Sequence, residues 1–347
     1  MMAIHPVILC GGGGTRLWPV STLSLPKPFL PLLGAETLFQ QAVARVAGDA
    51  QFAPPLVVAG AAHADLVMAQ LGDVPGARLV IEPAAKNTAP AIALAAALLP
   101  QDAVMLICPS DHYIADPAAF RAAALAAAAL AAQDYLVSFG ITADRPETGY
   151  GYLQRGEPLA GGFAVRRFVE KPDRVAAEAY LASGEYSWNG GIFAFRAGKL
   201  LAELAAHRPE MARLVAEAVA QGSNDGTRFH PAPGPFSAIA GESIDYAVME
   251  NTARAAMVPA SMGWSDIGNW AALADAMSEV ADDAGNIVRE GEVNLLQCRG
   301  VLATSDGPRI SAIGLKDVCI IVSGNEVLVT TRTGAQAVGK LPGAANQ

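Results

Sequence analysis

Four consecutive glycines follow the first apolar segment of the chain and lead into Thr15 and Arg16. With no side chains in the way, their backbone N–H groups can turn inward together and form a concave site for phosphate oxygens. Arg16, and Lys27 between two prolines, supply the positive charge that a polyphosphate needs. A P-loop would end in Gly-Lys-Ser/Thr, and the dinucleotide fingerprint would have a glycine where Arg16 stands. The loop therefore predicts a nucleoside triphosphate whose phosphates react.

Two later aspartates are candidates for a metal site. Asp111 ends the apolar run 104–110, and Asp266 lies in the segment 263–268. Mg²⁺ that is bound to phosphates commonly takes only one or two protein carboxylates. Each aspartate also has a structural alternative, because Asp111 could cap a helix or turn and Asp266 could cap a helix at 269–277. Spacing alone does not pair the two residues.

Three further segments suit a sugar phosphate. Pro172 would end the strand before it and hold Lys171 at the strand end, where a lysine can meet a phosphate. Asn189 offers both a donor and an acceptor beside two glycines, which suits sugar hydroxyls. Gly151 stands between two tyrosines and allows close approach of a ligand. The alternatives are a surface ion pair for Lys171 and ordinary turns for the other two segments.

Glu82 is a candidate for recognition of a nucleobase. A carboxylate can accept together the two adjacent N–H donors that guanine presents. Asn87 and Thr88 come shortly afterwards and precede a predicted helix at 88–99. Either of them is a good N-cap, which is the main role expected of them.

These residues are positioned by apolar strands and helices that alternate through the first two thirds of the chain. Strands are predicted at 7–10, 56–59, 79–81, 104–108 and 136–141. Helices are predicted at 37–47, 62–71, 88–99, 118–132, 174–183, 198–206 and 211–221. This alternation is typical of a parallel, doubly wound α/β sheet, and we predict a Rossmann-like domain with a doubly wound mixed sheet. Ligands in such sheets bind beyond the carboxyl ends of the strands, so the glycine loop and Asp111 should share one crevice.

The polar segment 282–286 predicts a domain boundary, with a large domain at 1–280 and a small β-rich domain at 285–347. Short strands are predicted at 294–297, 300–304, 310–313, 318–322 and 326–330. They are too few for a large core of their own, so this tail should pack on the main domain or on a second subunit. Their even spacing suggests a β-solenoid.

The composition excludes several classes of protein. The chain has 347 residues, of which 52% are hydrophobic and 16% charged, so it is not disordered. Its net charge of −9 argues against general nucleic-acid binding. A secretory signal and a membrane span are not expected. The cysteines lack metal-ligand spacing, and Cys10 and Cys108 predict reduced core thiols and a cytoplasmic location. No Ser-His-Asp or Cys-His arrangement indicates nucleophilic catalysis.

Together these segments resemble the mannose-1-phosphate guanylyltransferases (GDP-mannose pyrophosphorylases), a branch of the sugar-1-phosphate nucleotidylyltransferases. The matching motifs occur in order between residues 7 and 270, so the resemblance covers nearly the whole large domain. They are Gly11–Pro19 with Lys27, Glu82–Ala91, Pro109–His112, Arg145–Tyr152, Phe168–Pro172, Trp188–Gly191, Ser243–Glu250 and Gly263–Trp270. The segments 147–152, 243–250 and 263–268 are similar to the mannose-specific branch.

The resemblance implies transfer of GMP from GTP to α-D-mannose 1-phosphate, with Mg²⁺ as cofactor and pyrophosphate as the second product. By matching position, Arg16 and Lys27 are the implied catalytic residues, and Asp111 and Asp266 are the implied metal ligands. The implied nucleotide-binding residues are Gly11, Gly12, Gly13, Gly14, Thr15, Arg16, Glu82, Asn87, Thr88 and Asp111. The implied sugar-phosphate site consists of Gly151, Glu170, Lys171 and Asn189, with Lys171 at the phosphate.

Family members of similar length carry a small β-helical tail and are often dimers. The tail of this chain is therefore a candidate for a left-handed β-helix. A homodimer is therefore expected. The roughly 60 residues after Gly285 cannot hold the cupin isomerase domain of larger members, so mannose-6-phosphate isomerase activity is not expected. Two alternatives stay open: a broader nucleotidylyltransferase that accepts glucose 1-phosphate or ATP, and a non-catalytic sensor of GDP-mannose. The charged residues Arg16, Lys27, Asp111, Lys171 and Asp266 favour the enzyme.

Overall fold

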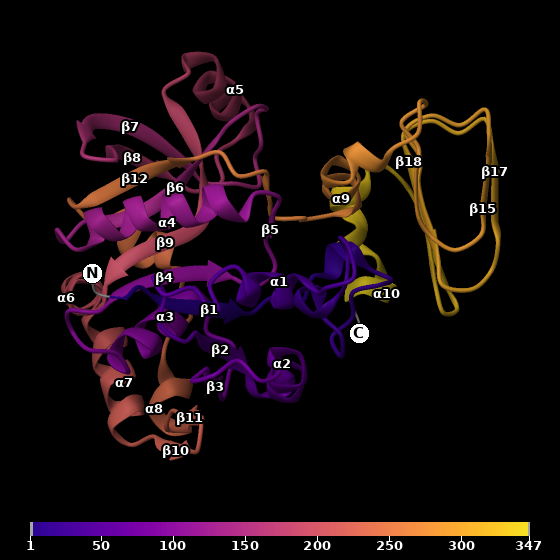
Figure 1. The fold of residues 1–347 in the computed structure, drawn as a ribbon. Helices are drawn as coiled ribbons and strands as arrows, with labels where there is room; N and C mark the ends of the chain where they lie inside the picture. Colours follow the sequence, from indigo (N-terminus) through magenta and orange to yellow (C-terminus); the bar gives the residue numbers. More distant parts are fainter. Residues whose placement is uncertain (1–2, 346–347) are drawn as a thin grey trace. The chain divides into compact units, whose positions relative to one another are not determined.

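The computed structural model describes residues 3–345, and the contacts within it divide the chain into two compact units (Figure 1). The first unit contains the residues up to 11, 41–110 and 114–264, and the second contains residues 12–40, 111–113 and those from 265 onward. Helix α1 (Leu38–Ala44) and the short strands β5 (Tyr113–Ile114) and β13 (Trp264–Ser265) lie where the chain passes between units. Within residues 3–345, no helix is long and apolar enough to cross a membrane.

The first unit is built on a sheet of eleven strands in the order β10-β11-β3-β2-β1-β4-β9-β6-β12-β8-β7. They are β1 (His5–Cys10), β2 (Leu56–Gly60), β3 (Arg78–Glu82), β4 (Val104–Pro109), β6 (Leu136–Thr142), β7 (Tyr152–Leu159), β8 (Gly162–Val169), β9 (Tyr186–Arg196), β10 (Ser223–Asp225), β11 (Arg228–His230) and β12 (Ala255–Ala260). All five strands predicted for the first two thirds of the chain are present. The predicted α/β class with a mixed sheet is confirmed.

Strands β1 to β4 run parallel to one another, so their carboxyl ends lie at one edge of the sheet. Strand β9 was not predicted: the alternative for the segment around Asn189 was an ordinary turn, whereas the structure has a strand there that lies antiparallel between β4 and β6. Since β9 runs the opposite way, its first residues reach the end of β6, where Trp188 pairs with Ile141 and Asn189 with Gly140. Candidate residues from parallel and antiparallel strands therefore meet at the same edge.

Helices cover both faces of this sheet. Helix α3 (Thr88–Ala97) has mostly small apolar side chains and is buried along residues 89–96. It packs with α6 (Ala197–His207) and α7 (Pro209–Ala220) against one face. Helix α4 (Pro117–Ala131) packs on the opposite face, where the ring of Phe120 lies 6.0 Å from that of Phe139. The remaining helices of this unit are η3 (Ala61–His63), α2 (Ala64–Leu71), α5 (Arg174–Ser183), α8 (Pro233–Ala238) and the π-helix η4 (Asp245–Met249).

The second unit has a core that combines segments far apart in the sequence. Leu17, Trp270, Leu302 and Val338 are buried together in it. The indole N–H of Trp270 donates to the backbone oxygen of Trp18 at 2.9 Å. Its helices are η1 (Thr15–Leu17), η2 (Lys27–Phe29), α9 (Trp270–Ala276), η5 (Ser278–Val280), η6 (Ala335–Lys340) and α10 (Pro342–Ala345). The tail thus shares a core with residues of the predicted large domain, as expected from its small size.

The tail strands form two ladders. They are β14 (Ile287–Glu290), β15 (Val293–Leu296), β16 (Leu302–Ser305), β17 (Ile310–Ile313), β18 (Val318–Ser323) and β19 (Glu326–Thr331). Strands β14, β16 and β18 pair in parallel, and so do β15 and β17, while β19 returns antiparallel to β18. Successive strands that alternate between two parallel ladders are typical of a β-solenoid. Its left-handed twist and the boundary between 1–280 and 285–347 stay sequence-based predictions.

Candidate functional site

Glu82, the last residue of β3, lies at the carboxyl-terminal edge of the parallel strands. Burial raises the pKa of its carboxyl group to about 7. Within residues 3–345, its buried Oε1 has no hydrogen-bond partner. A buried acceptor without a donor costs free energy, and a ligand with N–H groups would satisfy it. Glu82 therefore has the surroundings expected of a residue that receives donors from a base.

Asn87 and Thr88 begin helix α3. Asn87 is the N-cap, and its Oδ1 accepts from the backbone N–H of Thr88 at 2.8 Å. The hydroxyl oxygen of Thr88 accepts from the backbone N–H of Ile244 at 2.9 Å. The predicted capping role is thus confirmed for Asn87, while Thr88 ties the start of α3 to the segment that precedes η4.

Three residues of the predicted sugar site converge in the first unit. A Cβ atom at Gly151 would lie 2.6 Å from Oε2 of Glu170 and 3.5 Å from Nδ2 of Asn189. The backbone oxygen of Gly151 also accepts from the backbone N–H of Asn189 at 2.8 Å. Glycine at position 151 thus leaves open a point that polar atoms of both residues face. We call Gly151, Glu170 and Asn189 the sugar cluster.

Lys171 stands beside this cluster with a left-handed backbone φ of 46°. Its Nζ donates to Oε1 of Glu170 at 2.6 Å. Burial alone would lower the pKa of the Lys171 ammonium, but its hydrogen bond to Glu170 and the charge of Asp245 raise the pKa above its ordinary value. The lysine is thus held as a cation, and 61% of its side chain is exposed to solvent. The ion pair that was the alternative role predicted for Lys171 is therefore present, and it holds the lysine side chain in position.

The glycine loop continues in the second unit, and its glycines differ in surroundings. A Cβ atom at Gly14 would lie 2.7 Å from both Cβ of Lys27 and Oγ of Ser21. A Cβ atom at Gly12, whose φ is 95°, would meet no heavy atom within 4 Å. Gly14 thus allows Lys27 to pack closely, whereas Gly12 presents open backbone. Arg16 follows in η1.

Lys27 joins the two predicted metal ligands. It is only 6% exposed, and its Nζ donates to Oδ2 of Asp111 at 2.7 Å and to the backbone oxygen of Asp266. Burial alone would raise the pKa of Asp111, but Lys27 and His112 hold it below its ordinary value. Three residues from distant parts of the sequence therefore form one charged cluster within the second unit, with Asp111 ionised.

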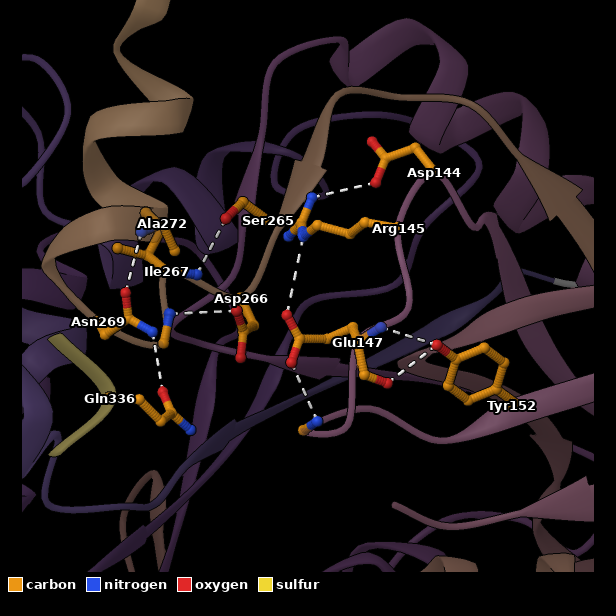
Figure 2. Close-up of polar contacts among 12 residues, drawn as sticks. Asp144, Arg145, Glu147, Tyr152, Ser265, Asp266, Ile267, Asn269, Ala272 and Gln336 are labelled. Atoms are coloured by element: carbon orange, nitrogen blue, oxygen red, sulfur yellow. Dashed lines mark hydrogen bonds and ion pairs between the residues drawn. The ribbon is translucent and has the colours of Figure 1, made fainter. Parts of the chain in front are cut away.

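Asp266 does not cap helix α9. The N-cap is Asn269, whose Oδ1 accepts from the backbone N–H of Ala272 at 3.0 Å (Figure 2). Asp266 instead accepts from the backbone N–H of Gly268 at 3.1 Å, within its own turn. The helix-cap alternative for Asp266 is therefore wrong, because the turn places Asn269 three residues further on at the helix start.

Asp111 and Asp266 fit a divalent cation that is bound together with phosphates. Carboxylate oxygens are the ligands that Mg²⁺ prefers, and two are sufficient when phosphate oxygens supply others. Among residues 3–345, no group of three or more His, Cys, Asp or Glu side chains could hold a metal ion. A divalent ion held by Asp111 and Asp266 would therefore depend on its substrate for part of its coordination.

Two residues that contact the sugar cluster were not predicted from the sequence. Oδ1 of Asp245 accepts from Nδ2 of Asn189 at 2.9 Å, and Oγ of Ser138 bonds to Oδ1 of Asn189 at 2.7 Å. Asp245 lies in the matched motif 243–250, and Ser138 is a buried hydroxyl in an otherwise largely apolar strand. A search for polar residues inside apolar strands could have found Ser138.

The loop before β7 is held by Glu147, as Figure 2 shows. Its Oε1 accepts from the backbone N–H of Gly149 at 3.1 Å, and its Oε2 lies 3.7 Å from Nε of Arg145. The hydroxyl of Tyr152 donates to the backbone oxygen of Glu147 and accepts from its N–H, both at 2.9 Å. The predicted turn is therefore present and leads directly into Gly151.

Comparisons with known proteins agree with the predicted family. The family model for nucleotidyl transferases matches residues 5–283. The chain is 44% identical to the xanthan biosynthesis protein XanB of Xanthomonas campestris pv. campestris, over 97% of this chain and 72% of that protein. It is 39% identical to the mannose-1-phosphate guanylyltransferase of Escherichia coli K12, with the same coverage of 97% and 72%. A solved structure from Thermus thermophilus, described as a mannose-1-phosphate geranyltransferase, has a TM-score of 0.89 at 30% identity and full coverage of both chains.

The substitution Lys27→Met tests the charged cluster through stability. It leaves Asp111 without its partner, which should lower the free energy of unfolding at pH 7 by about 1–3 kcal/mol. The loss for a fully buried pair is larger, but the Asp111 side chain is 28% exposed. Urea unfolding at pH 7 measures the change, and Lys316→Met, at an exposed tail position, is the matched control.

The same variant has an expected pH dependence. Lys27 depresses the folded-state pKa of Asp111, so the stabilisation is present above the unfolded pKa of about 3.9 and is lost as the pH falls through the lower folded value. In Lys27→Met, burial raises the pKa of Asp111 instead, and protonation relieves the cost. The deficit of the variant should therefore shrink between pH 7 and pH 5; an equal deficit at both would contradict the cluster.

Proposed function

Because this chain belongs to the nucleotidyl transferase family, we propose that it transfers GMP from GTP to α-D-mannose 1-phosphate, giving GDP-mannose and pyrophosphate. The observation that carries the proposal is the cluster of Lys27, Asp111 and Asp266 that follows the glycine loop. Phosphoryl-type transfer depends on positioning and on fixed positive charge, and this cluster provides both.

In the reaction, a phosphate oxygen of mannose 1-phosphate bonds to the α-phosphorus of GTP while the bond from that phosphorus to the pyrophosphate oxygen breaks. The attacking phosphate is already ionised, so no general base is needed. Backbone N–H groups of residues 11–15 bind the triphosphate, and Arg16 and Lys27 neutralise the charge that develops on it. Asp111 and Asp266 would hold a divalent ion, Mg²⁺ in our proposal, and that ion would supply positive charge at the phosphates.

The first unit selects the base and the sugar in this proposal. Glu82 accepts from the two adjacent N–H donors of guanine, near the start of α3 at Asn87 and Thr88. Lys171 binds the phosphate of mannose 1-phosphate, as its exposed cation suits. The sugar cluster binds the mannose hydroxyls. Support comes from the orphaned acceptor of Glu82 and from the convergence of the cluster around Gly151.

Pyrophosphate release from GTP, mannose 1-phosphate and Mg²⁺ tests the reaction. We expect release only when all three are present, with kcat/KM roughly 100-fold above that for ATP or glucose 1-phosphate, since unmatched polar groups are penalised. Similar values for the different substrates would favour the broader nucleotidylyltransferase. Binding of GDP-mannose without any release would favour the sensor.

Asp111→Asn and Asp266→Asn test the carboxylates. Each substitution should lower kcat by roughly 100-fold or more, because it removes charge that holds the divalent ion at the reacting phosphates. Titration with Mg²⁺ and Mn²⁺ should show a higher requirement for either ion. Asp65→Asn, on the exposed side of α2, should behave like the unchanged protein. Unchanged turnover in both site variants would remove these aspartates from the proposal.

Glu82→Gln tests base recognition. Glutamine replaces one acceptor with a donor, so kcat/KM for GTP should fall by at least about 10-fold. The pKa of Glu82 is about 7, so the unchanged protein should lose activity toward GTP as the pH falls through that value and the carboxylate is protonated. The variant should lack this part of the pH profile. Identical profiles would contradict the role, since titration of GTP itself is common to both.

We also propose a homodimer formed through the tail. Val327 and Val329 of the edge strand β19 are 60% and 62% exposed. Their partners across the ladder, Val322 and Ile320, face the same side and are buried. Analytical ultracentrifugation should give a dimer that Val329→Lys weakens; a monomer at micromolar concentration would contradict the proposal. Within residues 3–345 the cysteines are buried and form no disulfide, which supports our expectation of a reducing, cytoplasmic location.

A further inference from the structure

We propose that Asp245 and Ser138 are positioning residues that orient the amide of Asn189 so that it can only donate a hydrogen bond to a sugar hydroxyl. The inference rests on the proposed mannose site. It adds the direction of the hydrogen bond at Asn189 and the two residues that fix this direction.

The contacts of the Asn189 amide account for all but one of its hydrogen-bonding positions. Its Oδ1 has two lone pairs, which receive the hydroxyl of Ser138 at 2.7 Å and the backbone N–H of Gly191 at 3.1 Å. Its Nδ2 has two hydrogens, one of which is donated to Asp245 at 2.9 Å. The second hydrogen on Nδ2 is the position left for a ligand. Asn189 therefore cannot also accept from a hydroxyl, contrary to the sequence interpretation.

Two of these partners allow only one orientation of the amide. The ionised carboxylate of Asp245 can only accept, and the backbone N–H of Gly191 can only donate. A flipped amide would place its oxygen against the carboxylate and its NH₂ group against an N–H. Both contacts would be repulsive, so the donor side of Asn189 is fixed toward Asp245 and the remaining N–H is fixed with it.

Both positioning residues stand where polar side chains are costly. Ser138 is fully buried in strand β6. Asp245 is the first residue of the π-helix η4, a rare form that is frequent at functional sites. Burial and the neighbouring charge of Glu170 raise the pKa of Asp245 to about 6, so its ionised form is retained at neutral pH despite the cost. Apolar residues would suit both positions better if packing were their only task.

Glu170 complements the donor of Asn189. Its Oε2 lies near Nδ2 of Asn189 around the point that a side chain at Gly151 would fill. A hydroxyl group that reaches both atoms gives its hydrogen to Glu170 and receives one from Asn189. One donor and one acceptor in fixed positions determine the direction of that hydroxyl, which is how epimers of a sugar are told apart.

Monodeoxy analogues of mannose 1-phosphate test the proposal. The measurement is the penalty of each analogue, defined as the ratio of kcat/KM for mannose 1-phosphate to that for the analogue. In the unchanged protein, one analogue should have a penalty of at least about 10-fold, because it leaves Glu170 and Asn189 without a partner. That penalty should fall at least about threefold in Asn189→Ala, Asp245→Ala and Ser138→Ala, with KM for GTP unchanged. Asp245→Asn should restore it, since its amide oxygen can still accept from Asn189.

The outcomes separate this inference from the proposed function. A penalty that stays the same in Asn189→Ala overturns the mannose site and the orientation together. A penalty that falls in Asn189→Ala but stays at its full value in Asp245→Ala and Ser138→Ala overturns the orientation alone. A rate that falls equally for the parent and the analogue also overturns it, because the two residues then act only on structure. If Asp245→Ala does not fold, Ser138→Ala gives the same comparison.

Discussion

The charged cluster of the second unit depends on the burial of one ammonium group. Lys27 is almost excluded from solvent, and an unpaired cation in that position would be strongly destabilising. It is satisfied by the carboxylate of Asp111 and the backbone of Asp266, which come from separate parts of the sequence. Its close packing in turn requires that Gly14 has no side chain. The need to pair the buried ammonium of Lys27 therefore fixes the glycine loop and the two aspartates around it.

In the first unit, too, a glycine leaves room for polar groups that come close together. At Gly151 the missing side chain brings a carboxylate and an amide together, just as Gly14 admits Lys27. The result differs because the neighbours differ. Phosphates need fixed positive charge, whereas hydroxyl groups need donors and acceptors of known direction. The cluster at Lys27 offers the first kind of contact and the sugar cluster the second.

Much of this arrangement could be predicted from the sequence, because it follows from local patterns. Apolar runs that end in glycine or in a charged residue predicted strands β1, β3 and β4 and the candidate residues at their ends. The antiparallel insertion of β9 could not be predicted, since an apolar run does not encode its partner strand. Asp266 and Asn269 are both good N-caps, and only the three-dimensional turn decides between them. Asp245 was missed because a π-helix has no sequence signature that separates it from an α-helix.

The second unit combines segments that are far apart in the sequence, and this has a consequence for folding during synthesis. Residues 12–40 are made early, but the core that buries Leu17 also needs Trp270, Leu302 and Val338. While the ribosome is still adding these later segments, the apolar side chains beside the glycine loop have no partners to cover them. Most sheet residues of the first unit are already available by then, since β12 ends at Ala260. The second unit, with the glycine loop, therefore assembles after the sheet of the first unit, and a nascent chain stays exposed to aggregation and chaperones there until Val338 has been made.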